Sequence, residues 1–252
     1  MDLRITGKNV LVVGASKGIG RAIALAFSRE GCVVTAVARS TELLTGLLAD
    51  MGGEALGHHV ITADVSAEGT GKALAQQWLN AGHRFDIVVH NVGHPHGVRD
   101  PLSPMIEWRR VWYLNAGIAI DMNEVLVPPM LERGWGRVIH ISSISAEMLR
   151  GAAPYAAAKA YLNAYTKTVG RALAQTGVIF SAIMPGAVAF EGSYWDIQSS
   201  TQPERVSDFL RHHQAVGRFG SPEEIASYAV FLGSHLASFA QGTVLPVDGG
   251  NM

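Results

Sequence analysis

The sequence predicts an α/β fold: one doubly wound parallel sheet of about seven strands, with helices on both faces. Three observations carry this prediction. Short apolar runs alternate with helical patterns throughout the 252 residues, a glycine-rich turn directly follows the first run, and no linker or repeat divides the chain. Such alternation requires right-handed crossovers and places ligands at the carboxyl ends of the strands. We therefore expect a single domain over residues 1–252.

The elements follow one another in a regular order. Apolar runs predict strands at 9–13, 32–38, 57–62, 86–90, 136–142, 178–184 and 243–247. Helical spacing predicts helices at 18–30, 41–50, 68–81, 105–132, 153–175 and 222–233. Residues 187–221 break this rhythm with aromatic residues among Gly, Ser, Gln and Pro, which is typical of a lid or binding element. A helical flap packed on a neighbouring subunit is the alternative.

Composition argues against several functional classes. The net charge of -1 supplies no basic field for nucleic acid. The amino terminus is too polar for a signal peptide, and no apolar stretch is long enough to span a membrane. The single cysteine, Cys32, excludes an internal disulfide, and its apolar strand predicts a buried, inert thiol. We expect a cytoplasmic protein with neither nucleic-acid nor membrane partners.

A phosphate-binding turn is predicted directly after the first strand. Strand, glycine-rich turn and helix in this order place backbone N–H groups at a helix N-terminus, where a phosphate is favoured. The glycines permit a tight turn and the close approach of a pyrophosphate. We therefore predict a dinucleotide site with the turn residues Gly14, Ser16, Lys17, Gly18, Ile19 and Gly20.

A candidate acid/base pair lies further along the chain. Tyr155 and Lys159 are four residues apart, so both side chains leave the same face of a helix. A nearby ammonium favours the phenolate and is expected to lower the pKa of Tyr155, which would suit a general acid or base. Such pairs are common on solvated helices. Here, however, the three alanines between them leave an open surface for a flat ligand.

Taken together, these segments resemble the short-chain dehydrogenase/reductase family over nearly the whole chain. The matching motifs, in order, are Gly14-x-x-x-Gly18-x-Gly20, His90-Asn91-Val92-Gly93, Asn115, Gly136 to Ser143, Tyr155-x-x-x-Lys159, Pro185-Gly186 and Val247-Asp248-Gly249-Gly250. The resemblance implies a Rossmann-like fold and hydride transfer between a nicotinamide coenzyme and a carbonyl or secondary alcohol. Suitable substrates would be a 3-oxoacyl thioester, a sugar-derived ketone or another ketone. A catalytically silent, coenzyme-binding regulatory or interaction protein is the alternative.

The same resemblance implies roles for individual residues. Tyr155 would exchange a proton with the substrate oxygen, Lys159 would support it and bind the nicotinamide ribose, and Asn115 would anchor a water. Capping of a broken helical turn accounts for Asn115 equally well. A serine would hold the substrate oxygen. The usual spacing from the tyrosine selects Ser142, but alignment along the strand selects Ser143, and we choose Ser143 because loops absorb deletions more readily than strands.

The end of the second strand bears on the choice of coenzyme. It carries Arg39 and no carboxylate, and Lys17 adds a second positive charge, so the sequence favours NADP(H) over NAD(H). A solvated loop charge is the alternative for Arg39. Asp64 and Val65 resemble the family's pair beside the adenine ring, although a helix N-cap explains Asp64 as well.

The resemblance implies further coenzyme contacts and an oligomeric state. The further coenzyme contacts that it implies are Asn91, Gly93, Pro185, Gly186 and Val188, while Phe190 replaces the usual threonine that contacts the nicotinamide. His94 and His96 lack a third ligand and so indicate a polar rim more than a metal site, and this rim would also include Arg99, Glu147 and Arg150. A homotetramer (or homodimer) is implied, built partly on the helix at 153–175.

Overall fold

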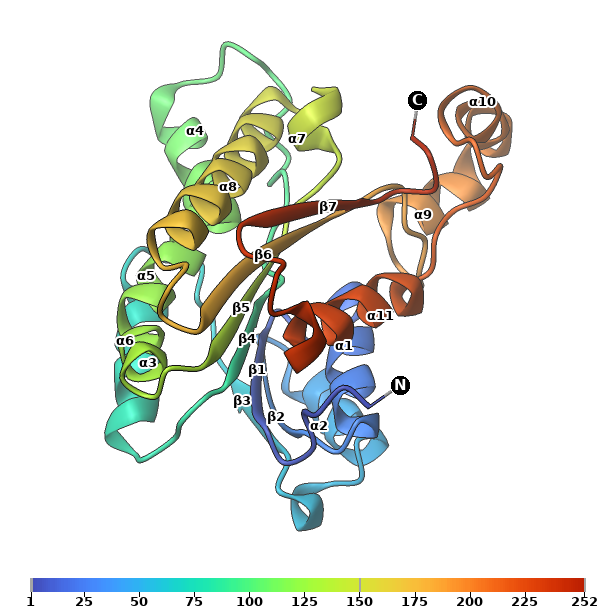
Figure 1. The fold of residues 1–252 in the computed structure, drawn as a ribbon. Helices are drawn as coiled ribbons and strands as arrows, with labels where there is room; N and C mark the ends of the chain where they lie inside the picture. The colour runs from blue at the N-terminus through green and yellow to red at the C-terminus, as the bar shows by residue number, and fades with distance from the viewer. Residues whose placement is uncertain (1, 150, 252) are drawn as a thin grey trace.

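Seven parallel strands form one sheet in the computed structural model, which describes residues 2–149 and 151–251 (Figure 1). Their order is β3-β2-β1-β4-β5-β6-β7, so the predicted fold class is confirmed. The strands are β1 (Asn9–Val13), β2 (Val33–Ala38), β3 (His59–Thr62), β4 (Ile87–His90), β5 (Gly136–Ile141), β6 (Val178–Pro185) and β7 (Thr243–Val247). Strand order reverses between β1 and β4, and in sheets of this type ligands bind at the carboxyl ends of the strands beside that point.

Helices cover both faces of the sheet. They are α1 (Gly18–Arg29), α2 (Thr41–Asp50), α3 (Thr70–Asn80), α4 (Met105–Trp112), α5 (Ile118–Leu126), α6 (Pro128–Glu132), α7 (Ser145–Met148), α8 (Ala153–Ala172), α9 (Tyr194–Thr201), α10 (Pro203–His213) and α11 (Pro222–Gly233). Short turns of helix lie at Glu54–Leu56, Tyr113–Gly117 and His235–Ala237. Figure 1 shows α1, α2 and α11 on one face, and α3, α5, α6 and α8 on the other. No helix in the described part of the chain is long and apolar enough to cross a bilayer.

The core consists of two apolar layers separated by the sheet. Alternate side chains of β1 enter different layers: Val12 packs with Phe27 of α1, and Val13 lies in the layer that contains Met122 of α5. Because both faces are covered, most positions in the central strands β1, β2 and β4 are apolar and buried. Cys32 is buried beside the first layer, and burial raises the pKa of its thiol to about 12, which makes it a poor nucleophile.

The helix predicted at 105–132 is present but not regular: α4 continues through a π-helical turn into α5, and α6 follows after a break at Val127. The π-helical turn at Tyr113–Gly117 carries Asn115. A π-helical turn contains one extra residue, which changes the direction in which the neighbouring side chains leave the helix. Such turns are frequent at functional sites. Pro128 is the first residue of α6. A backbone N–H at this position has no partner within the helix, so proline, which lacks one, loses no hydrogen bond there.

Residues 187–221 form two helices, α9 and α10, that project from the sheet beside the carboxyl terminus (Figure 1). The aromatic rings of this segment pack on one another: the ring centroid of Trp195 lies 4.2 Å from that of Phe209 and 5.0 Å from that of Phe219. The segment is therefore a helical flap with its own small core. Whether it acts as a lid or packs on another subunit stays a prediction.

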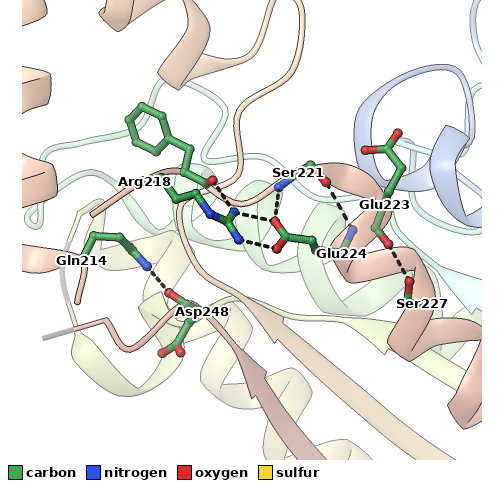
Figure 2. A network of polar contacts seen from close by, with 8 residues as sticks. Gln214, Arg218, Ser221, Glu223, Glu224, Ser227 and Asp248 are labelled. Carbon is green, nitrogen blue, oxygen red and sulfur yellow. Dashed lines mark hydrogen bonds and ion pairs between the residues drawn. The ribbon is translucent and has the colours of Figure 1, made fainter. Parts of the chain in front are cut away.

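The base of this flap is held by polar contacts, drawn in Figure 2. Arg218 donates two hydrogen bonds to Glu224, at 2.9 and 2.7 Å, and Glu224 also belongs to the capping box that begins α11 with Ser221. Gln214 donates to the carbonyl oxygen of Asp248 in the C-terminal segment. These contacts fix where the flap leaves the sheet.

Candidate active site

The glycine turn approaches α1 so closely that a side chain would not fit. A Cβ at Gly20 would lie 2.1 Å from the carbonyl oxygen of Gly14. Asn91, just past β4, donates a hydrogen bond of 2.8 Å to that same oxygen and so fixes the turn from the neighbouring strand. Lys17 at the N-cap of α1 provides no side-chain cap, and the first turn of α1 contains no acidic residue. The N–H groups at this helix start are therefore suited to an anionic ligand.

The ring of Phe190 covers this turn. A Cβ at Gly18 would lie only 2.4 Å from the ring, and Gly18 has a φ of +56°. The Phe190 backbone is held by Ser193, whose hydroxyl accepts a hydrogen bond of 3.1 Å from the Phe190 N–H. The start of the flap and the glycine turn are thus in direct contact.

Lys17 and Arg39 act electrostatically on one rim of the site. Burial lowers the pKa of His94, and the charges of His96, Arg39 and Lys17 lower it further. The two predicted coenzyme-binding cations are therefore near the same imidazole. His94 Nδ1 accepts a hydrogen bond from the His96 N–H at 2.8 Å, so this nitrogen already has a partner.

Asp64 and Val65 follow β3. Hydrogen bonds from Ser66 lower the pKa of the Asp64 carboxyl, and Arg39 lowers it further. Val65 is buried in the core layer below. The alternative reading of Asp64 as a helix N-cap is wrong, because Gly69 takes that position in α3 and Asp64 instead accepts the N–H of Ser66 at 2.9 Å.

Lys159 and Asn115 meet at Gly93. The position that a Cβ of Gly93 would occupy is 2.7 Å from both Lys159 Nζ and Asn115 Oδ1. Asn115 Nδ2 donates to the carbonyl oxygens of Val111 (2.8 Å) and His94 (2.9 Å), whereas its Oδ1 is buried with no partner in the described part of the chain. Asn115 therefore caps its irregular turn and also presents an acceptor to the site.

The structure separates the two candidate serines. The hydroxyl of Ser143 forms a hydrogen bond to the phenol of Tyr155 and accepts the N–H of Ser145 at 3.1 Å. Ser142 is buried, and its hydroxyl donates to the backbone carbonyl of Lys159 at 3.3 Å. The geometry thus brings Ser143, and not Ser142, to Tyr155.

The expected effect of Lys159 on Tyr155 is wrong in this structure. Burial raises the pKa of Tyr155, and the hydrogen bond from Ser143 only partly opposes that rise. Lys159 is 2% exposed, and its burial lowers the pKa of its ammonium to about 7. Its Nζ lies 5.8 Å from the Tyr155 ring centroid and donates to the carbonyl oxygen of Ile141 at 2.8 Å. Desolvation is the main cause of the pKa shift of each group.

A buried polar chain that the sequence did not predict lies behind the site. His90 Nε2 contacts Asn123 Oδ1 at 2.9 Å, Asn123 Nδ2 contacts His140 Nε2 at 3.3 Å, and His140 Nδ1 contacts Thr166 Oγ1 at 2.8 Å. The Thr166 hydroxyl donates to the carbonyl oxygen of Leu162, so it accepts from His140 Nδ1. Each group then donates to the next, which leaves His90 Nδ1 as a bare acceptor.

One signal in the sequence does point to this chain. His90 and His140 occur within apolar stretches of their strands, and β4 and β5 place them directly opposite each other. His90 and Asn115 also line one cavity of about 10 Å³, close to the smallest volume that can hold one water. Each of these two residues also has one buried acceptor without a partner in the described part of the chain, His90 Nδ1 and Asn115 Oδ1.

The remaining predicted residues lie around the carboxyl edge of the sheet. The carbonyl oxygen of Pro185 accepts the N–H of Ile144 at 3.1 Å, and a Cβ at Gly186 would lie 2.7 Å from the Cα of Asp248. Val188 is buried and bridges to Gly220. Within residues 2–149 and 151–251, no group of three or more His, Cys, Asp or Glu residues could hold a metal ion. Arg150 lies outside the described residues.

The arrangement fits a nicotinamide dinucleotide. The glycine turn offers N–H groups and space for a pyrophosphate, and Gly93 leaves room beside Lys159 and Asn115. The phenol of Tyr155 and the hydroxyl of Ser143 form a pair able to donate hydrogen bonds to one oxygen atom. Such a pair is suited to stabilise charge on a carbonyl oxygen and to deliver a proton to it.

Comparison with known proteins agrees with this geometry. A family model described as enoyl-(acyl carrier protein) reductase matches residues 14–251. The 3-oxoacyl-(acyl-carrier-protein) reductase of Aquifex aeolicus (strain VF5) is 30% identical, over 99% of this chain and 99% of that protein. The L-sorbose reductase from Gluconobacter frateurii, complexed with NADPH and L-sorbose, superposes with a TM-score of 0.88 at 29% identity, covering 99% of this chain and 98% of that one. A 7α-hydroxysteroid dehydrogenase complexed with NADH gives a TM-score of 0.87 at 27% identity, covering 100% and 96%.

Proposed function

The chain belongs to the short-chain dehydrogenase/reductase family, and on that premise we propose that it is an NADP(H)-dependent enzyme that interconverts a ketone and a secondary alcohol. Membership in this family establishes that the protein is an NAD(P)-dependent oxidoreductase. Its preference for NADP(H) and its substrate class are what we propose. One observation carries it: the hydrogen-bonded pair Tyr155 and Ser143 lies beside Lys159 at the edge of the sheet that bears the glycine turn.

The protein's part in the reaction is to orient the substrate and move a proton. The bound coenzyme supplies or accepts the hydride at its nicotinamide ring. Because burial raises the pKa of Tyr155, the phenol is protonated at neutral pH and serves as the proton donor for carbonyl reduction. Ser143 holds the same substrate oxygen as a neutral donor. Lys159 and Asn115 would hold the ribose side of the coenzyme, and the unpartnered Asn115 Oδ1 could anchor a water between Lys159 and solvent.

The preference for NADP(H) rests on Lys17 and Arg39. Both cations affect the same histidine at the rim, and β2 ends without a carboxylate that would repel a 2′-phosphate. The relatives themselves use both coenzymes, since the L-sorbose reductase structure contains NADPH and the hydroxysteroid dehydrogenase structure contains NADH. The direct test is the ratio of kcat/KM for NADPH and NADH with one substrate.

The substrate is expected among 3-oxoacyl thioesters, sugar-derived ketones and other ketones. Two similar proteins are named for 3-oxoacyl and L-sorbose reduction, and His94, His96 and Arg99 provide polar groups near the rim. NADPH oxidation followed by absorbance against a panel of these ketones tests the proposal. Turnover of one class supports it, whereas coenzyme binding with no turnover across the panel favours a catalytically silent, coenzyme-binding protein.

We also propose a homotetramer (or homodimer) in which one interface uses the outer faces of α4 and α8. The rings of Trp112 on α4 and Tyr161 on α8 meet edge to face at 5.5 Å, and Tyr161 is exposed. An exposed aromatic pair on adjoining helices is suited to burial against a second copy. Analytical ultracentrifugation tests this, and a monomer at micromolar concentration would contradict it.

A further inference from the structure

A second cavity lies at the opposite edge of the sheet, at the amino-terminal ends of β5 and β6. Its volume is about 250 Å³, and its lining includes Trp135, Arg137, Ile179, His235 and Ser238. None of these residues belongs to the proposed active site. This volume is far larger than one inorganic anion requires. It approaches the volume of small-molecule sites, which is typically about 300–1,000 Å³.

Arg137 brings a buried charge to this cavity. It is 3% exposed, and its Nε donates to the carbonyl oxygen of Ser234 at 3.1 Å. Its Nη1 donates to the carbonyl oxygens of Gly136 (2.9 Å) and Gly177 (3.3 Å), while its Nη2 forms no hydrogen bond or ion pair within the described part of the chain. Burial lowers the pKa of the guanidinium to about 10. Carbonyl oxygens satisfy three N–H groups, but they do not neutralise the charge, and a buried cation without an anion is unfavourable.

Other cations act on two residues of the cavity wall, His235 and Trp135. Burial lowers the pKa of His235, and Arg137, Arg4 and Lys8 lower it further. Lys8 Nζ lies 4.3 Å from the centroid of the Trp135 ring, and the guanidinium carbon of Arg137 lies 4.6 Å from it. This end of the sheet therefore concentrates positive charge around one aromatic side chain.

The acidic residue at the start of β4 does not balance this charge. Asp86 accepts the N–H of Asn9 at 3.0 Å and pairs with Arg133 at 3.8 Å. Trp135 adds a further unmet donor, since its indole N–H is buried and has no acceptor within residues 2–149 and 151–251. An anion in the cavity would balance the charge of Arg137, whereas the indole N–H is too deeply buried to line the cavity.

We propose that this cavity binds a small organic carboxylate, with its carboxylate group on Arg137 Nη2 and its apolar body against Trp135 and Ile179. A guanidinium with one free N–H edge is a strong donor to a carboxylate. The aromatic ring and the aliphatic side chain beside it favour an apolar body. This site is separate from the coenzyme edge, at the other end of β5, and its occupation needs no catalytic turnover.

The test uses the indole N–H signals of the ¹⁵N-labelled full-length protein, one from each of its 5 tryptophans. Trp135→Phe assigns the signal of Trp135. Benzoate is the probe, benzamide is its neutral counterpart, and inorganic phosphate is the anion without an apolar body. We expect benzoate to shift the Trp135 signal saturably, benzamide to leave it in place, and phosphate to bind at least about tenfold more weakly than benzoate, because it lacks contacts with Trp135 and Ile179.

Matched variants locate the binding charge. Arg137→Gln is expected to weaken benzoate binding by about tenfold or more, the loss of one charge-assisted hydrogen bond. Arg133→Gln removes the same charge from a neighbouring residue that already has a carboxylate partner, and it should leave the affinity unchanged. Arg39→Gln removes a charge from the coenzyme rim and should likewise have no effect.

Three results would overturn the proposal: no saturable shift with benzoate, a shift that persists unchanged in Arg137→Gln, or a shift that Arg39→Gln abolishes. Phosphate binding as strongly as benzoate would show that the ligand need not be organic.

If circular dichroism shows that Arg137→Gln does not fold, Lys8→Gln replaces it, because the Lys8 side chain contacts the face of Trp135 and forms no hydrogen bond with the backbone in the described part of the chain. Lys8→Gln should weaken benzoate binding severalfold, and unchanged affinity would count against the site.

Discussion

The ammonium group of Lys159 donates a hydrogen bond of 2.8 Å to the carbonyl oxygen of Ile141, the last residue of β5. This bond joins the first half of α8 to the carboxyl end of the strand. Tyr155, one turn earlier on α8, therefore lies against Ser143, just beyond the strand end. The lysine thus positions the tyrosine through the backbone, in addition to any role toward a coenzyme.

Tyr155→Phe is expected to lower kcat by about a thousandfold, because it removes only the proton that reduction requires. The dissociation constant for NADPH, measured by fluorescence titration, should stay within about threefold, a difference below 1 kcal/mol. Tyr228→Phe is the matched control, since Tyr228 is an exposed tyrosine on α11, away from the site. A Tyr155→Phe enzyme that keeps most of its activity refutes the assignment.

Alanine substitutions should distinguish the two serines. Ser143→Ala is expected to reduce kcat by about a hundredfold, because it removes a donor to the substrate oxygen. Ser142→Ala should instead lower the free energy of unfolding by about 1 kcal/mol, since it loses one buried hydrogen bond to α8. Steady-state kinetics and urea unfolding on both variants measure this. The reverse pattern would favour Ser142 as the catalytic serine.

Arg39→Asp should reverse the coenzyme preference. The new carboxylate would repel a 2′-phosphate and accept a ribose hydroxyl, so the KM for NADPH should rise by about 10- to 100-fold while that for NADH falls. Lys17→Gln should raise the KM for NADPH alone, by a smaller factor. Arg29→Gln at the end of α1 is the charge control. Equal changes for both coenzymes in Arg39→Asp would show that Arg39 does not contact a 2′-phosphate.

Acid should destabilise the protein through its buried histidines. His90 has its pKa lowered by burial from 6.5 to about 4, and that of His140 is lowered as well. Between these pH values the unfolded chain binds more protons than the folded one, so the free energy of unfolding falls as the pH decreases. His90 alone contributes about 3 kcal/mol to this loss, the equivalent of its pKa shift.

Urea unfolding between pH 6.5 and pH 4, the two pKa values of His90, measures this loss. His90→Asn should flatten the profile, although the variant will be less stable at neutral pH because Asn123 loses its partner. His212→Gln, on the exposed face of α10, should leave the slope unchanged. A His90→Asn profile as steep as that of the parent protein would show that other groups govern the acid response.

Gly18 and Phe190 should be energetically coupled in coenzyme binding. Gly18→Ala places a Cβ within 2.4 Å of the ring at a positive φ, so we expect weaker NADPH binding. Phe190→Ala removes the clash but not the backbone strain, so the double variant should recover part of the loss, with a coupling energy of about 1 kcal/mol. Gly46→Ala, where a Cβ meets nothing within 4 Å, is the control. Additive effects of the two substitutions would show that the ring does not press on the turn.

Much of this molecule follows from local patterns. Every predicted strand is present, because continuous burial on two faces produces apolar runs that are visible in the sequence. The glycine turn and the spacing of Tyr155 and Lys159 are equally local, since a helix puts residues four apart on one face. Cys32 was predicted to be buried for the same reason: its neighbours in the strand are apolar.

Other features depend on neighbours that are distant in the sequence. The direction of the Tyr155 pKa shift comes from burial by surrounding segments, and helical spacing alone suggested the opposite sign. The contact of Ser143 with Tyr155 requires both the end of β5 and α8. The buried chain from His90 through Asn123 to His140 joins two strands and a helix. Desolvation and hydrogen bonding act through space, so only the packed fold could determine which of these polar groups meet and which charge states they favour.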